Sequence, residues 1–138
     1  MEKEKEDIDE KEILSRLRSC PNHDKLRFIY LYGSYASGET SERSDIDICL
    51  YYDIDDKREL HKTLYRISGS FPDKYDIQMF QLLPLYVQKE VFKGELLYAE
   101  DKGFVHDIAR KTIKEYDDFE PRYKYILYGK TGMEGAEL

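Results

Sequence analysis

The chain has 138 residues, of which 37% are charged, and its formal net charge is −7 at pH 7. A chain of this length predicts one domain that buries about 70% of the surface exposed by its unfolded form, so it needs no disulfide staples. The negative charge argues against binding to nucleic-acid backbones, which requires clustered lysines and arginines. We therefore expect one globular domain without a direct nucleic-acid ligand.

The cysteines and the N-terminal sequence indicate a protein of the reducing cytoplasm. Cys20 and Cys49 are too few for a disulfide framework, so we interpret both as reduced thiols. The residues that follow Met1, 2–7, are all charged and form no apolar leader, and no apolar run of about 18 residues occurs. The sequence thus predicts a soluble, cytoplasmic protein that does not enter a membrane.

In chain order, helical and strand patterns alternate without internal repeats, which predicts an α/β (α+β) fold. The expected elements are a helix over 8–18, a strand over 26–32, a strand over 45–52, a helix over 55–68, a strand over 74–80, a helix over 85–93, a strand over 96–99 and a last helix from about 101. Pro21, Gly69 and Gly94 are expected to end the first three helices.

Residues 1–128 are expected to form a single domain, which begins with an acidic helix within 1–19 and ends with a helical segment over 101–128. In that last segment, apolar spacing predicts five inward residues: Val105, Ile108, Ala109, Ile113 and Tyr116. Pro121 is expected to kink or interrupt the helix. The final residues, 129–138, are expected to form a flexible tail.

A tight turn follows the first strand. The segment over 26–32 is rich in aromatic and branched residues and is terminated by Gly33-Ser34. Glycine permits backbone angles and close approaches that a Cβ would forbid. Ser34 can offer its N–H and its hydroxyl to a phosphate oxygen. The turn is therefore a candidate phosphate-binding element.

Two carboxylates lie on the next strand. Asp45 and Asp47 follow the turn after a spacer of ten residues, 35–44. Residues two apart on a strand share a face and lie about 6.6 Å apart, so both carboxylates converge while Ile46 points to the opposite face. Like charges at this spacing repel, and a divalent cation such as Mg²⁺, which favours hard oxygen ligands, is the ordinary remedy.

Asp76 supplies a third carboxylate, within the strand pattern over 74–80. In a site of two metal ions about 3.5–4 Å apart, the ions stabilise both the attacking and the leaving oxygens of an in-line displacement. Asp73 is a weaker candidate, because Pro72-Asp73 predicts a turn before the strand. The predicted metal ligands and catalytic residues are therefore Asp45, Asp47 and Asp76.

Single residues exclude the competing motifs. Gly33 and Gly38 have the spacing of a Walker A loop, but Glu39 stands where a lysine must reach the phosphates. The acidic run over 53–56 lacks the glycine of a calcium-binding loop, where this chain has Arg58. No G-x-G-x-x-G fingerprint occurs, and the three histidines show no metal-ligand spacing.

The Gly33-Ser34 pair, the ten-residue spacer, the Asp45-Ile46-Asp47 motif and the later Asp76 resemble the signature of a known superfamily. They are similar to the nucleotidyltransferases related to DNA polymerase beta, and specifically to the minimal nucleotidyltransferase (MNT) branch, over most of residues 26–128. This resemblance implies a nucleotidyltransferase fold with a small mixed β-sheet flanked by helices, ATP as substrate and two Mg²⁺ ions.

The resemblance also implies a role for each signature residue. Gly33 and Ser34 would hold the triphosphate, and Asp45 and Asp47 would bind Mg²⁺. Asp76 would complete the metal site and help to deprotonate the attacking hydroxyl. Many relatives have an arginine after the Gly-Ser pair where this chain has Tyr35, and Arg43 is the nearest basic substitute for binding the nucleotide. 

The segments over 93–98 and 116–123 resemble the small antitoxins encoded beside HEPN-domain ribonuclease toxins. That subgroup implies a Mg²⁺-dependent protein adenylyltransferase, which moves AMP from ATP to a tyrosine of its HEPN partner and silences the ribonuclease. Two other functions stay open. One is an antitoxin that acts by occlusion alone, and the other is an enzyme that adenylylates a small hydroxylated molecule such as an aminoglycoside.

Overall fold

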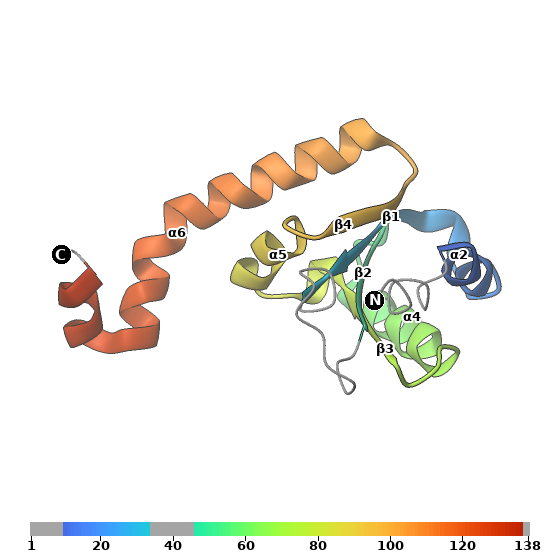
Figure 1. Ribbon diagram of the computed structural model, residues 1–138, viewed down its shortest axis with the longest axis horizontal. Helices are drawn as coiled ribbons and strands as arrows, with labels where there is room; N and C mark the ends of the chain where they lie inside the picture. The colour runs from blue at the N-terminus through green and yellow to red at the C-terminus, as the bar shows by residue number, and fades with distance from the viewer. Residues whose placement is uncertain (1–9, 34–45, 137–138) are drawn as a thin grey trace, which may run out of the picture.

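The computed structural model of the protein describes residues 10–33 and 46–136 (Figure 1). Its helices and strands in chain order are α2 (Glu10–Arg18), β1 (Leu26–Tyr32), β2 (Ile46–Tyr52), α4 (Lys57–Gly69), β3 (Tyr75–Met79), α5 (Leu85–Val91), β4 (Glu95–Ala99) and α6 (Lys102–Ala136). The predicted order of helices and strands is confirmed, with small shifts at the element ends.

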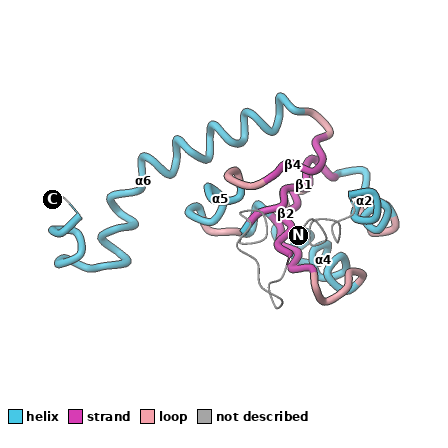
Figure 2. Tube along the Cα trace, in the orientation of Figure 1, coloured by secondary structure: helices cyan, strands magenta, loops and turns pink. Residues whose placement is uncertain are grey.

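The strands form one mixed sheet in the order β3-β2-β1-β4. β1 is antiparallel to both of its neighbours, whereas β2 and β3 are parallel. A parallel pair needs a crossover connection, and α4 provides it between β2 and β3. α2, α4 and α5 lie around this central sheet, whereas most of α6 extends away from it (Figure 2). β3 is an edge strand, so its outer edge pairs with no other strand in the described part of the chain.

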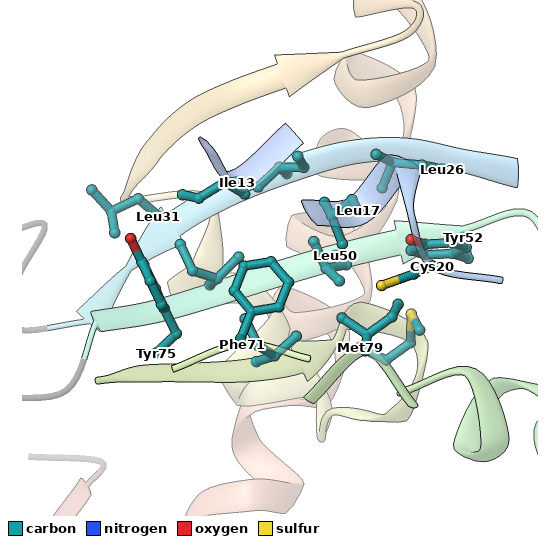
Figure 3. Packing of buried hydrophobic residues seen from close by; sticks show 14 of the residues in the cluster. Ile13, Leu17, Cys20, Leu26, Leu31, Leu50, Tyr52, Phe71, Tyr75 and Met79 are labelled. Carbon is teal, nitrogen blue, oxygen red and sulfur yellow. The ribbon is translucent and has the colours of Figure 1, made fainter. Parts of the chain in front are cut away.

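One face of the sheet packs against α2 and α4. Side chains alternate between the faces of a strand, and Ile46, Ile48 and Leu50 of β2 all point to this side. Ile13 and Leu17 of α2 are buried in the same cluster, as Figure 3 shows. Ile13 and Leu17 are therefore part of the apolar surface with which α2 covers this face.

The opposite face packs against α5 and the start of α6. Its buried cluster joins Phe28 of β1, Cys49 of β2, Val91 of α5 and Val105 of α6. Phe28 also meets Phe80 nearly edge to face, with ring centroids 5.8 Å apart, which is a favourable geometry for two aromatic rings. The sheet is thus covered on both faces.

Both cysteines are buried and free of disulfide bonds. Burial raises the pKa of the Cys49 thiol above its ordinary value, because the thiolate would lose its hydration. A thiol that stays protonated is a poor nucleophile, so Cys49 contributes to packing rather than to chemistry. The interpretation of the two residues as unpaired thiols is confirmed.

α4 begins at a capped N-terminus. The carboxylate of Asp56 accepts a hydrogen bond of 3.1 Å from the backbone N–H of Arg58, which satisfies a donor of the first turn. We expect Asp56→Ala to lower the free energy of unfolding by about 1 kcal/mol in urea denaturation. Asp55→Ala is the control and should change it by less than about 0.5 kcal/mol. Equal losses in both variants would contradict the capping role.

α6 is longer than the sequence pattern predicts. It is one helix through Pro121 and reaches Ala136, so regular structure extends beyond Gly129, where we expected it to end. Of the two outcomes expected at Pro121, a kink or an interruption, the interruption does not occur, because a helix can absorb a proline by bending. Figure 1 shows α6 changing direction in its orange-to-red part. None of the described helices, α6 included, is long and apolar enough to cross a membrane.

The buried face of α6 also differs from its prediction. Val105 and Thr112 are buried, whereas Ile113 is 41% exposed, so the inward position predicted for Ile113 is wrong. Val105, Thr112 and Tyr116 recur at helical spacing, and this stripe turns Ile113 toward solvent. Lys89 of α5 lies 4.3 Å from the centre of the Tyr116 ring, a cation–π contact that joins α5 to this stripe.

Candidate active site

The backbone turns at Gly33, directly after β1. Its φ of 80° lies in the left-handed region, which residues with a Cβ rarely adopt. A Cβ built on Gly33 would overlap Oδ2 of Asp47. The backbone angle therefore favours glycine, and the close approach brings the backbone directly against the carboxylate of Asp47.

β2 and β3 hold two of the predicted acids at the same level. The strands are parallel, and Asp47 pairs with Asp76 in their register. Paired residues on neighbouring strands point to the same face, and the strands lie about 4.8 Å apart. Both acids are half-buried. The structure thus brings Asp47 and Asp76 side by side.

These acids meet Gly33 at one end of the sheet. Asp47 and Asp76 are each the second residue of a strand. β1 runs in the opposite direction, and its last residue, Tyr32, pairs with Asp47. The phosphate-binding turn proposed after β1 therefore lies beside the carboxylates of β2 and β3.

Tyr32 is a member of this site that the sequence analysis did not identify. Burial raises the pKa of its phenol, and repulsion from Asp47 and Asp76 adds to the shift, as does Cys49. The phenol therefore stays neutral and can donate a hydrogen bond. The only sequence signal for Tyr32 is its position immediately before Gly33.

Gln78 orients Asp76. Its side-chain amide donates a hydrogen bond of 3.1 Å from Nε2 to Oδ1 of Asp76. Gln78 follows two residues after Asp76 on β3, so both side chains point to the same face of the strand. The hydrogen bond leaves Oδ2 of Asp76 for a metal ion or a reacting hydroxyl. Asp73, by contrast, is exposed and lies outside β3, as the turn pattern predicts.

A groove borders Asp76. Its volume is about 650 Å³, and it is lined by His61, Lys62, Leu64, Tyr65, Ser68, Asp76, Ile77 and Gln78. Among the described residues these come from α4 and β3 alone, with none from β2, so the groove opens at the outer edge of the sheet. We call it the α4–β3 groove. No sequence pattern predicts it, because its walls come from two separate elements.

Three predicted site residues, Ser34, Arg43 and Asp45, lie outside the described residues. Within the described part of the chain, no group of three or more histidines, cysteines or acids could hold a metal ion. Asp47 and Asp76 nevertheless supply hard carboxylate oxygens at one level of the sheet, which is the donor type that Mg²⁺ and Mn²⁺ prefer. These residues fit a divalent cation whose remaining ligands come from elsewhere.

Family comparison matches the same part of the chain. Residues 17–103 match the family model described as "Polymerase beta, Nucleotidyltransferase", and this range includes Gly33, Asp47 and Asp76. The chain belongs to this nucleotidyltransferase family. The assignment explains why a glycine turn and paired carboxylates meet at one end of the sheet, since the transfer of a nucleotidyl group requires both phosphate binding and charge neutralisation.

A curated relative of this nucleotidyltransferase is named "Putative protein adenylyltransferase MJ1547", from Methanocaldococcus jannaschii. The two sequences are 38% identical over 96 residues, which are 70% of this chain and 74% of the relative. Its name describes an enzyme that adds adenylyl groups to proteins.

Solved structures of toxin–antitoxin complexes share the fold. One contains AMP-PNP and matches with a TM-score of 0.69 and 24% identity, over 87% of this chain and 96% of that chain. Another is a tri-AMPylated Shewanella oneidensis HEPN toxin in complex with its MNT antitoxin, with a TM-score of 0.63 and 22% identity, over 86% of this chain and 92% of that chain. The expected nucleotidyltransferase fold, a small mixed sheet with flanking helices, is therefore confirmed.

Proposed function

We propose that this nucleotidyltransferase transfers AMP from ATP to a tyrosine of a cognate HEPN ribonuclease toxin and thereby acts as its antitoxin. The observation that carries the proposal is the in-register pair Asp47 and Asp76 beside the Gly33 turn. The name of the 38% identical relative supports protein adenylylation. The AMPylated HEPN toxin bound to an MNT antitoxin of the same fold supports this partner.

The reaction follows from the chemistry of the site. The tyrosine oxygen forms a bond to the α-phosphorus of ATP, the bond between that phosphorus and the bridging α–β oxygen breaks, and pyrophosphate leaves. Asp76, whose Oδ2 is left available by the hydrogen bond from Gln78, is proposed to help deprotonate the tyrosine hydroxyl. Gly33 and Ser34 are proposed to hold the triphosphate through backbone N–H groups.

The proposed metal ligands are Asp45, Asp47 and Asp76, and the proposed cofactor is Mg²⁺ as two ions. When bound, the ions would neutralise charge on the phosphates and on both oxygens of the displacement. Arg43 is the proposed basic contact to the nucleotide. The two unpaired thiols fit the reducing cytoplasm, which we propose as the site of action.

Intact-mass spectrometry of the HEPN protein tests this function directly. After incubation with the nucleotidyltransferase, Mg²⁺ and ATP, its mass should rise by one or more AMP units, and omission of ATP or addition of EDTA should prevent the gain. The variant Asp45→Asn/Asp47→Asn should give no gain. A stable complex that silences the ribonuclease with no change in mass would show instead that the antitoxin acts by occlusion.

Gln78 offers a finer test of the site. We expect Gln78→Leu to lower kcat for AMP transfer about ten-fold with little change in KM for ATP, because Asp76 loses the donor that orients it. Gln78→Glu replaces that donor by another carboxylate and should lose at least as much. Steady-state kinetics at saturating HEPN protein measures both effects. A wild-type kcat in both variants would contradict the positioning role.

A further inference from the structure

The direction from which the acceptor tyrosine approaches can be inferred from the order of the strands, provided that the proposed function holds. In an in-line displacement, the attacking and leaving oxygens lie on opposite sides of the phosphorus. Gly33 follows β1, whereas Asp76 lies on β3, two strands away and thus about 10 Å across the sheet. With the leaving pyrophosphate near Gly33, the tyrosine hydroxyl must arrive from the β3 edge.

The α4–β3 groove lies at this edge. Asp76 and Gln78 of β3 line it, and so does Tyr65 of α4. Tyr65 is 82% exposed, the highest value among the large hydrophobic side chains in the described part of the chain. Tyrosine is enriched in protein interfaces, because its ring buries a large area and its hydroxyl keeps a hydrogen bond.

A row of positive charge runs along α4 beside this groove. Arg58, Lys62 and Arg66 follow one another at intervals of four residues, so they lie on one stripe of the helix, about 12 Å long at ~1.5 Å per residue. All three side chains are exposed. In the described part of the chain, none of them takes part in a side-chain hydrogen bond or an ion pair. We call this stripe the basic ridge.

The basic ridge is unfavourable for the isolated protein. Like charges four residues apart destabilise a helix by roughly 0.2–0.5 kcal/mol per pair. Arg58 is also in the first turn of α4, where the helix dipole disfavours positive charge. The row of like charges therefore has a local electrostatic cost, which an anionic partner would offset.

We propose that the α4–β3 groove and the basic ridge together form the docking surface for the protein substrate. The substrate presents an acidic patch to Arg58, Lys62 and Arg66, and its target tyrosine enters past Tyr65 toward Asp76. Lys62 belongs to both the ridge and the groove, so charge recognition and the reacting centre are continuous on this surface.

Two other occupants fit this surface less well. The triphosphate of ATP is proposed to lie beside Gly33, about 10 Å across the sheet from β3. The basic ridge lies on α4, beyond that edge strand, so the triphosphate would not reach it. A second copy of this chain, docked by a two-fold axis through this surface, would bring one basic ridge against the other. Charge repulsion therefore disfavours that dimer.

Charge reversal on the ridge tests the proposal. The variant Arg58→Glu/Lys62→Glu/Arg66→Glu replaces the three cations, and Tyr65→Ser removes the exposed ring. The matched control, Arg18→Glu/Lys25→Glu/Lys102→Glu, changes net charge by the same amount at exposed positions on other elements. Circular dichroism confirms folding, and binding of AMP-PNP reports the nucleotide site separately.

We expect the ridge variant to raise KM for the HEPN protein at least about ten-fold, and to weaken its complex measured without ATP by a similar factor. The wild-type affinity should fall steeply with added salt, and that of the ridge variant should not. Tyr65→Ser should raise KM as well. The control triple variant should keep the wild-type KM and affinity.

Other outcomes would overturn the proposal. Unchanged KM and affinity in the ridge variant, with AMP transfer intact, would remove the docking surface and leave the proposed function standing. If the wild-type protein bound the HEPN protein without transferring AMP, the proposed function would be wrong. The loss or retention of HEPN binding in the ridge variant would still decide whether the docking surface is correct. A third outcome would assign the ridge to RNA: the wild-type protein binds single-stranded RNA, and the ridge variant loses this binding without any change in its affinity for the HEPN protein.

Discussion

Asp47→Asn and Asp76→Asn are each expected to lower the rate of AMP transfer about 10³-fold, because the site loses a charged oxygen ligand for the divalent cation. Asp76→Asn also removes the proposed proton acceptor, while its amide oxygen can still accept the hydrogen bond from Gln78. Single-turnover measurement of radiolabelled AMP on the HEPN protein gives the rate of the chemical step directly.

Asp73→Asn is the matched control for Asp76→Asn. Asp73 lies three residues earlier, is exposed, and precedes β3, so its replacement should leave the transfer rate within about two-fold of wild type. All three variants should melt near the wild-type temperature without metal. Asp47 and Asp76 are half-buried like charges on neighbouring strands, so the neutralisation of either one removes no stabilising interaction between them, and Asp73 is exposed. A comparable loss of activity in Asp73→Asn would disprove the assignment of the third acid.

Gly33→Ala is expected to lower both stability and activity. A residue with a Cβ at a φ of 80° costs roughly 1–2 kcal/mol of backbone strain. The new methyl group would also displace the carboxylate of Asp47, which it overlaps. A displacement of about 1 Å in a catalytic site can lower the rate about 10²-fold. Urea denaturation and single-turnover AMP transfer measure the two losses.

Gly69→Ala is the control, because the structure does not require glycine at that position. Gly69 ends α4, and a Cβ there would meet no atom within 4 Å. Alanine is the better helix former and should raise the free energy of unfolding by about 0.5 kcal/mol with unchanged activity. If Gly33→Ala kept wild-type stability and transfer rate, the proposed close approach between the turn and Asp47 would be wrong.

The local elements could be predicted because each one repeats a pattern of its own residues. The aromatic and branched run of β1 ends at a Gly-Ser pair, and the structure places β1 over the predicted residues. Asp56 caps α4 close to the start predicted for that helix, at residue 55. Longer-range consequences were less predictable. Ile113 is apolar but lies outside the buried stripe of α6. Burial of a helical residue depends on which elements pack against the helix as well as on the spacing of its apolar residues.

The pairing of Asp47 with Asp76 illustrates what a pattern along the chain omits. The sequence placed each acid on a strand, with Asp47 on the face opposite Ile46. It did not specify that β2 and β3 are adjacent, parallel and in register at these two residues. Strand order is set by packing between segments far apart in the sequence, and a shift of one residue would turn one of the acids to the other face.

The sequence by itself determined the chemistry available to this protein: a glycine turn for phosphate, acids at alternate strand positions for metal, and free thiols. Ser34, Arg43 and Asp45 stay predictions, because they lie outside the described residues. Only the tertiary structure decided which groups meet. It set Tyr32 and Gln78 beside the acids and opened the α4–β3 groove next to Asp76. The physical reason is that side-chain types are encoded locally, whereas distances between strands and helices follow from how their apolar faces pack.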